Sequence, residues 1–156
     1  MKLNFKFDSG NCGPIEKIIF DGIVGYATEK SWGDSISAVW LLLESSVMLK
    51  IQSKMQDIDE WVEVGALAFD CVASMDDRKK IVRLPNAWRN ISQIKKMVIG
   101  DGFFAAESGI QITNKLGESL IVVASENPFQ VEIRAPFFNG SFAPEYKILA
   151  YKLEDF

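Results

Sequence analysis

The feature of the sequence that most constrains its fold is a similarity between its two halves. Residues 131–139 read V-E-I-R-A-P-F-F-N, and residues 62–70 read V-E-V-G-A-L-A-F-D. Two further pairs of segments match in the same order: 120–125 with 48–53, and 94–102 with 15–22. Three matches in one order indicate a duplicated unit. We therefore predict a single domain over residues 1–156, made of two similar β units over residues 15–85 and 94–153.

Short apolar segments between clusters of turn-forming residues predict mainly β structure. Residues 2–7 alternate between apolar and polar side chains, and residues 15–20 form a β-branched run that ends at the turn signal Asp21-Gly22. Such runs at intervals of roughly 8–12 residues are typical of a sandwich or barrel. We expect an internally duplicated β-sandwich or a barrel-like pair of antiparallel sheets, with little helix.

Residues 36–55 allow two interpretations. Apolar runs at 37–43 and 47–53 surround the polar turn 44–46, which predicts a hairpin. The alternative is a helix, because Val39, Leu42, Leu43 and Met48 roughly share one helical face. We prefer the hairpin, because polar and apolar residues alternate after residue 48 and because the second half repeats the pattern around a glycine turn.

Composition excludes several classes of function. The net charge is −4 and the sequence pI is about 4.9, whereas a nucleic-acid-binding protein normally carries a basic patch. The chain has no histidine, which is the commonest general base and the commonest metal ligand. No phosphate-binding glycine loop, nucleophile elbow or zinc spacing is present. We expect no enzyme activity, no cofactor, no metal and no nucleic-acid partner.

The N-terminal residues and the cysteines bear on location. The first residues alternate and turn polar before any apolar core forms, so we expect no signal peptide. No apolar run approaches the roughly 20 residues of a membrane span. Cys12 and Cys71 are the two cysteines, and we predict that both are reduced thiols of a cytoplasmic protein. A single disulfide between them is the alternative that the sequence leaves open.

Acidic residues form one set of candidate partner-binding side chains. Residues 56–60 read Q-D-I-D-E and replace the shorter turn 126–128 of the second half. Because the fold closes with the short turn, the added residues are better explained by function than by structure. A second acidic pair is Asp76–Asp77. We predict that the carboxylates of the longer loop meet a basic partner, and these are Asp57, Asp59 and Glu60.

Adjacent aromatic residues form the other set. Phe103-Phe104 and Phe137-Phe138 place neighbouring rings on opposite faces of a strand, so one ring of each pair is expected at the surface. Exposed rings mark binding surfaces. We therefore add Phe103 and Phe138 to the partner-binding candidates.

These observations rank three functions. The first is a non-enzymatic protein-binding domain, in one form an inhibitor or immunity-type protein that neutralises a basic partner such as a nuclease toxin. The second is a carrier of a small apolar ligand, with a pocket between the β units. The third and lowest is a carboxylate-dependent hydrolase. A homodimer is compatible with each of them.

Overall fold

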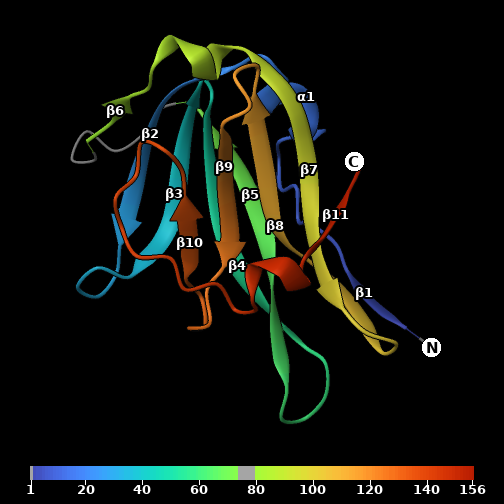
Figure 1. The fold of residues 1–156 in the computed structure, drawn as a ribbon. Coiled ribbons are helices and arrows are strands. Elements are labelled where there is room, and N and C mark those ends of the chain that lie inside the picture. The colour runs from blue at the N-terminus through green and yellow to red at the C-terminus, as the bar shows by residue number, and fades with distance from the viewer. Residues whose placement is uncertain (1, 74–79) are drawn as a thin grey trace.

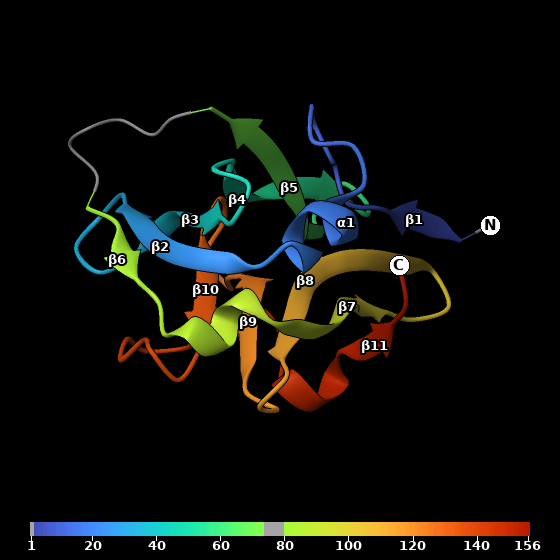
Figure 2. The same ribbon diagram turned by 90° about the horizontal axis from the view of Figure 1, so that it is seen from above.

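The computed structural model describes residues 2–73 and 80–156 and shows a mainly β fold. Its strands form one open sheet that curves strongly around a core (Figures 1 and 2). The predicted mainly β fold with little helix is confirmed. The pair Asp76–Asp77 lies outside the described residues. The strands are β1 (Leu3–Phe5), β2 (Ile23–Lys30), β3 (Ile36–Leu43), β4 (Met48–Asp57), β5 (Glu63–Val72), β6 (Val82–Arg83), β7 (Ile91–Gly100), β8 (Phe104–Asn114), β9 (Ser119–Ala124), β10 (Val131–Arg134) and β11 (Lys152–Glu154).

The sheet contains two runs of four antiparallel strands. In the first run β2, β3, β4 and β5 each pair with the next strand, and β7, β8, β9 and β10 do the same in the second. The runs join where Val131 of β10 pairs with Ile36 of β3. At the margins β11 pairs with β7, β6 pairs with β2, and β1 lies parallel to β8. A sandwich of two separate sheets is therefore not confirmed.

The hairpin predicted over residues 36–55 is confirmed. β3 and β4 pair antiparallel, and the turn between them places Ser46 in the left-handed region with a φ of 72°. The turn between β8 and β9 has the same hydrogen bonds, and Gly117 takes the equivalent position with a φ of 84°. Both hairpins therefore close through the same three-residue loop, which favours glycine at its last position.

The strand predicted for residues 15–20 is wrong, because this segment forms the helix α1 (Ile15–Phe20). Pro14 precedes the helix, and Ile15 and Ile19, four residues apart, are both buried. Packing of these two side chains onto the core outweighs the β-branched composition. The matching segment 94–102 lies largely in the strand β7, so this correspondence fails. The correspondence of 62–70 with 131–139 holds only in part, because β5 continues to Val72 whereas β10 ends at Arg134. The internal duplication is not confirmed.

The main core lies inside the curve of the sheet. One end of it is closed by α1 and by η1 (Asn86–Arg89), whose residues Ile15, Ile19 and Trp88 are buried in the same cluster as the strands. A bulge at Ser108 exchanges the two faces of β8. Side chains before the bulge therefore join a second cluster, which the C-terminal segment with η2 (Ile148–Ala150) covers through Tyr151.

The outer edge of β5 is covered by single residues of other segments. The Asp8 N–H donates to the Leu67 carbonyl oxygen at 3.1 Å, and the Phe69 N–H donates to the Asp8 carbonyl oxygen at 2.7 Å. The Asn11 side chain accepts from the Cys71 N–H and donates to the Cys71 carbonyl oxygen, both at 2.8 Å. An unpaired edge invites pairing with another chain, and these contacts prevent it.

The prediction of two free cysteines is wrong, because Cys12 and Cys71 form a disulfide. The two residues are 59 positions apart, and their Cα atoms lie 5.2 Å apart. The pairing of Asn11 with Cys71 is what brings the N-terminal turn to the end of β5. The argument for a cytoplasmic location rested on reduced thiols and loses that support.

Candidate functional site

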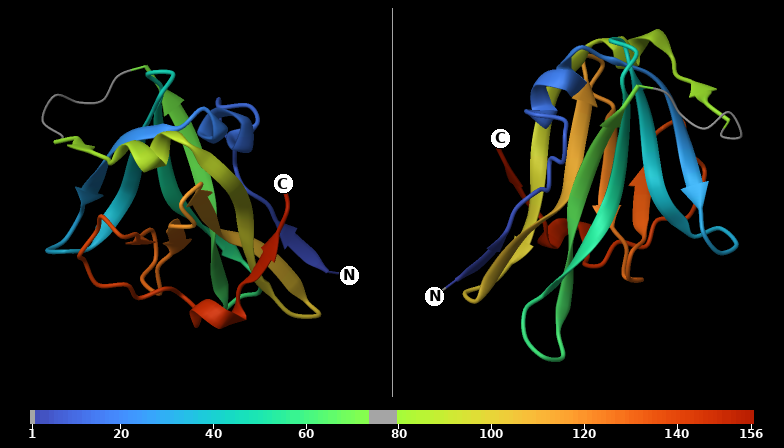
Figure 3. Two further views of the ribbon diagram at one scale, coloured as in Figure 1. Left: turned by 45° about the horizontal axis from the view of Figure 1, so that its top comes forward. Right: turned by 180° about the vertical axis from the view of Figure 1, so that it is seen from behind.

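Four hairpin tips project from the same end of the fold. They connect β2 to β3, β4 to β5, β7 to β8 and β9 to β10, and they all lie toward the lower side of Figure 1 and of the right-hand view in Figure 3, spread across the width of the molecule. The opposite end carries α1, η1 and the two hairpin turns described above. We call the four tips together the tip face, and it consists of residues 31–35, 58–62, 101–103 and 125–130.

Each tip carries one strongly exposed aromatic side chain. Trp32 is 82% exposed, Trp61 90%, Phe103 76% and Phe129 69%. These are the four most exposed aromatic residues of the described chain, and every one of them lies on the tip face. Isolated exposed rings are common on protein surfaces, but the location of all four at one end makes this end a candidate interaction surface.

The tip face is also strongly acidic. Its residues include five carboxylates and neither lysine nor arginine, and the carboxylates are Asp34, Asp59, Glu60, Asp101 and Glu126. Asp57 adds a sixth at the last position of β4, and Lys30 at the last position of β2 adds a cation that pairs with Asp34 at 3.4 Å. A surface with one sign of charge attracts a partner of the opposite sign and speeds its association. The four tips therefore carry a net negative charge.

Two of the tips share one local structure. The Asp59 Oδ1 atom accepts the N–H groups of Trp61 and Val62, at 2.8 and 2.9 Å. The Asp101 Oδ1 atom accepts the N–H groups of Phe103 and Phe104, at 2.7 and 3.3 Å. In both cases the carboxylate fixes the turn, and the residue two positions later, Trp61 or Phe103, projects into solvent.

A surface pocket of about 460 Å³, which we call the tip pocket, lies between these two tips and β1. It brings together Asp59 and Phe103, two residues that sequence reasoning proposed separately. Of its two aromatic residues, Phe104 is 8% exposed and Phe103 76%, so one ring of this pair is at the surface, as predicted. The residues that line the pocket are Leu3, Ile58, Asp59, Val62, Asp101, Phe103 and Phe104.

The β9–β10 tip is held in a strained conformation. Phe129 has a φ of 62°, a left-handed conformation that a bulky side chain rarely adopts. The Ser125 hydroxyl donates to Glu132 Oε1 and accepts from the Asn127 N–H, both at 3.2 Å. Partial burial raises the pKa of the Glu132 carboxyl. The Glu132 carboxylate is therefore half-buried and anchors the tip.

The other predicted site residues do not line the tip pocket. Asp57 and Glu60 belong to the β4–β5 tip, outside the pocket lining, and both are exposed. Phe138 lies elsewhere, because it follows β10 at the end away from the tip. Its ring is half-buried, 6.4 Å from the ring of Tyr26, and packs against the core.

Sequence reasoning missed Trp32, Trp61, Phe129 and Asp101 as site residues. A signal was present, since each of the three rings stands among turn formers, in S-W-G-D, D-E-W-V and N-P-F-Q. An aromatic residue within a turn signal has no strand face to bury it. Only the topology places the separate turns at one end.

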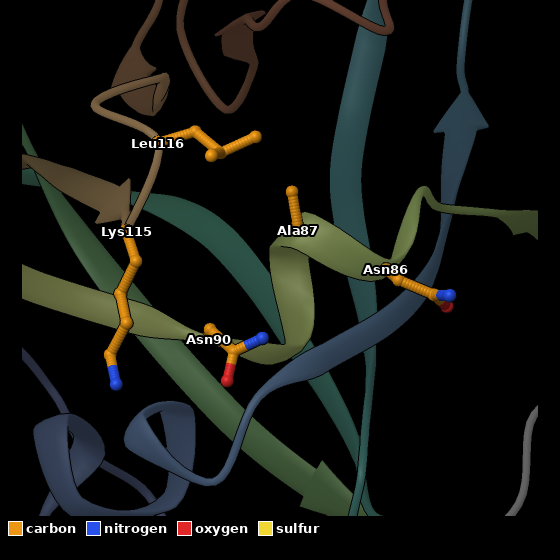
Figure 4. Close-up of a pocket in the computed structure, with 5 residues that line it drawn as sticks. All are labelled: Asn86, Ala87, Asn90, Lys115 and Leu116. Atoms are coloured by element: carbon orange, nitrogen blue, oxygen red, sulfur yellow. The ribbon is translucent and has the colours of Figure 1, made fainter.

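Two further pockets differ in chemistry from the tip face. One of about 300 Å³ lies at the opposite end, where Leu116 reaches toward Ala87 while the Lys115 side chain extends the other way (Figure 4). Two asparagines, Asn86 and Asn90, complete its lining. The other pocket, of about 460 Å³, is lined by Gln111, Ser119, Ile121, Arg134, Ala135 and Pro136. Neither combines exposed aromatic rings with carboxylates.

Within residues 2–73 and 80–156 no group of three or more carboxylates and cysteines is placed to hold a metal ion. In the same part of the chain no helix is long and apolar enough to cross a membrane. No protein-family model, no curated protein and no solved structure matches the chain.

Proposed function

We propose that the chain is a non-enzymatic protein-binding domain that holds a basic partner through the tip face. The observation that carries this proposal is the coincidence of two properties at one end: the four most exposed aromatic rings of the described chain, and five carboxylates on tips that themselves hold no lysine or arginine. Aromatic anchors supply most of the binding energy of protein interfaces, and charge complementarity steers the encounter.

The scaffold supports this role. Each tip is the short connection of an antiparallel hairpin, and the strands behind it are buried in a continuous core. Loops on such a rigid frame present side chains without a large ordering cost on binding. Within this class, we infer an inhibitor or immunity-type protein, whose task is to occlude a basic surface such as that of a nuclease toxin.

The test removes the four rings together. Replacing Trp32, Trp61, Phe103 and Phe129 by serine should abolish binding to the purified partner recovered from the native cell, because truncating each anchor costs about 2 kcal/mol or more. The matched control replaces Phe20 and Leu116, exposed apolar residues of the other end, and should keep affinity. Retained binding by the four-tip variant contradicts the proposal, as does preference for lipid vesicles over any protein.

An apolar-ligand carrier is the second candidate, and one observation favours it. Five of the seven residues that line the tip pocket are apolar, and its volume of about 460 Å³ is within the range of small-molecule sites. A carrier should bind a fluorescent apolar probe, and Phe104→Ala should abolish that binding. A response unchanged by this substitution would exclude the pocket as the ligand site.

The carboxylate-dependent hydrolase stays the lowest candidate. Asp59 and Asp101 line one pocket, but the Oδ1 atom of each is occupied by two backbone N–H groups that form the turn. This arrangement explains both residues by local structure. A general acid–base pair is not required to account for them.

A further inference from the structure

We infer that the tip pocket is the receptor for one arginine side chain of the partner. This inference rests on the proposed function and names the chemistry that its interface recognises. The pocket is built by three separate segments, β1, the β4–β5 tip and the β7–β8 tip. The main chain fixes β1 against the β7–β8 tip, because β1 pairs with β8 and the Leu3 N–H donates to the Phe103 carbonyl oxygen at 2.9 Å. The β4–β5 tip is held by side-chain packing, since Ile58 packs against the same apolar cluster as Phe104.

The walls of the pocket suit the aliphatic stem and the flat head of arginine. Leu3, Ile58 and Val62 supply aliphatic surface, and Phe103 and Phe104 supply two aromatic rings. A guanidinium group is planar and weakly hydrated, and it stacks on aromatic faces with a gain from the cation–π interaction. A carrier of uncharged ligands would need the same walls but no carboxylates beside them.

The carboxylates beside the pocket favour an arginine side chain over an uncharged ligand. Asp59 and Asp101 come from different hairpins and flank the same pocket. Each Oδ1 atom is used by its own turn, whereas within the described residues no hydrogen bond or ion pair engages either Oδ2 atom. Lys2, the neighbour of Leu3, likewise forms no ion pair with either aspartate. Within residues 2–73 and 80–156, therefore, two carboxylate acceptors beside an apolar pocket are engaged by no cation.

Arginine fits this arrangement better than lysine. A guanidinium group carries five N–H donors in a rigid fork, so one head reaches acceptors on two sides while its plane lies against a ring. A lysine ammonium is compact and strongly hydrated, and it loses more hydration on entering an apolar pocket. The free Oδ2 atoms also offer the charge-assisted hydrogen bonds that arginine makes with carboxylates.

The experiment uses amino-acid amides as probes and follows the backbone amide signals of the whole chain by NMR. N-acetyl-arginine amide should shift the signals of Leu3, Val62, Phe103 and Phe104 in a saturable manner. N-acetyl-citrulline amide has nearly the same shape without the charge, and it should leave these signals in place. N-acetyl-lysine amide should bind several-fold more weakly than the arginine probe. An equal response to arginine and citrulline, or the absence of any shift with arginine, overturns the inference.

Substitutions then assign the binding to the two aspartates. Asp59→Asn keeps an Oδ1 acceptor for the turn, and Asp101→Ser keeps a hydroxyl acceptor, so both turns survive without their charge. Together the two substitutions should weaken binding of the arginine probe at least about tenfold, as expected for the loss of charge-assisted hydrogen bonds. The control pair Asp57→Asn and Glu60→Gln removes the same charge outside the pocket and should change affinity by less than about twofold. An equal loss of affinity in both double variants would show a diffuse effect of net charge and would contradict binding of arginine in the pocket.

A third variant separates this inference from the proposed function. Trp32→Ser and Phe129→Ser alter the two tips that do not line the pocket. These two substitutions should weaken binding of the protein partner and leave the affinity for the arginine probe unchanged. If the four-tip variant still binds the partner, the proposed function fails whatever the probe does. If the partner needs the tips but the arginine probe does not bind, only the arginine inference fails.

Discussion

Gly65 of β5 and Ala124 of β9 lie against each other where these two strands approach closely. A Cβ atom placed on Gly65 would lie 2.6 Å from the Ala124 Cβ and 2.9 Å from the Ser53 Oγ. At the same crossing the Ser108 hydroxyl, from the bulge of β8, donates to the Gly65 carbonyl oxygen. The position therefore requires glycine because two strands approach there, and its φ is not in the left-handed region.

Gly65→Ala should destabilise the protein by about 1–3 kcal/mol, the usual cost of overpacking a filled core. Urea denaturation measures the change. Gly102→Ala is the control, because a Cβ at that position meets nothing within 4 Å. Adding Ala124→Gly to Gly65→Ala should recover part of the loss, and a double-mutant cycle without coupling would contradict the close crossing.

The disulfide leads to a second prediction. It closes a loop between residues 59 positions apart, so its removal should lower the free energy of unfolding by about 2–4 kcal/mol. Denaturation with and without a reductant measures this difference. A Cys12→Ser, Cys71→Ser variant should unfold like the reduced protein and should not respond to reductant. Thiol titration of the denatured, unreduced protein should find no free thiol, and two reactive thiols would contradict the disulfide.

Local patterns predicted the parts of the fold that local chemistry decides. The β3–β4 hairpin was predictable because alternation and a polar turn coincide in adjacent residues. The helix α1 was not, because burial of Ile15 and Ile19 against the core outweighs the strand preference of their segment. The sequence does not decide whether the disulfide forms, since the contact between Asn11 and Cys71 that accompanies it spans 60 positions.

The candidate site was also predictable only in part. Sequence reasoning found Asp59 and Phe103 by residue type, as part of an acidic loop and as one of two adjacent rings. It did not place them in one pocket, because that depends on β1 and two hairpins that meet only in the folded chain. Trp61 and Phe129 were missed because each directly precedes an apolar strand segment, and local sequence does not show that β5 begins only at Glu63 and β10 only at Val131.

Glu145 should make stability depend on pH. Its carboxylate accepts the Gly65 N–H at 3.1 Å, and burial raises the pKa of the carboxyl above 4.5. The folded state therefore holds this proton more tightly than the unfolded chain. The stability that the protonated form contributes is complete below pH 4.5 and is lost as the pH rises through the folded pKa.

Glu145→Gln tests this, because glutamine keeps an oxygen for the Gly65 N–H and carries no charge. The free energy of unfolding, measured at pH values on both sides of 4.5, should fall less steeply for the variant than for the parent. Burial also raises the pKa of Glu132, so part of the slope should remain. Glu154→Gln, at an exposed position of β11, is the control. An unchanged slope in Glu145→Gln would assign the dependence to other groups.

The acidic residues of the β4–β5 tip should separate into two roles. Asp57 and Glu60 are exposed, and no hydrogen bond or ion pair within the described residues engages either side chain. Reversing both to lysine should slow association with the basic partner and weaken its salt dependence. The free energy of unfolding should change by no more than about 0.5 kcal/mol. Stopped-flow association at several salt concentrations, together with urea denaturation, measures both effects.

Asp59 should behave differently, because its carboxylate accepts two backbone N–H groups of the turn. Asp59→Ala should lower the free energy of unfolding by about 1 kcal/mol, the net value of such hydrogen bonds, whereas Asp59→Asn should preserve it. Loss of stability in the Asp57 and Glu60 reversals, or none in Asp59→Ala, would contradict this division. If association with the partner does not slow when Asp57 and Glu60 are reversed, the tip contributes to the fold but not to the encounter.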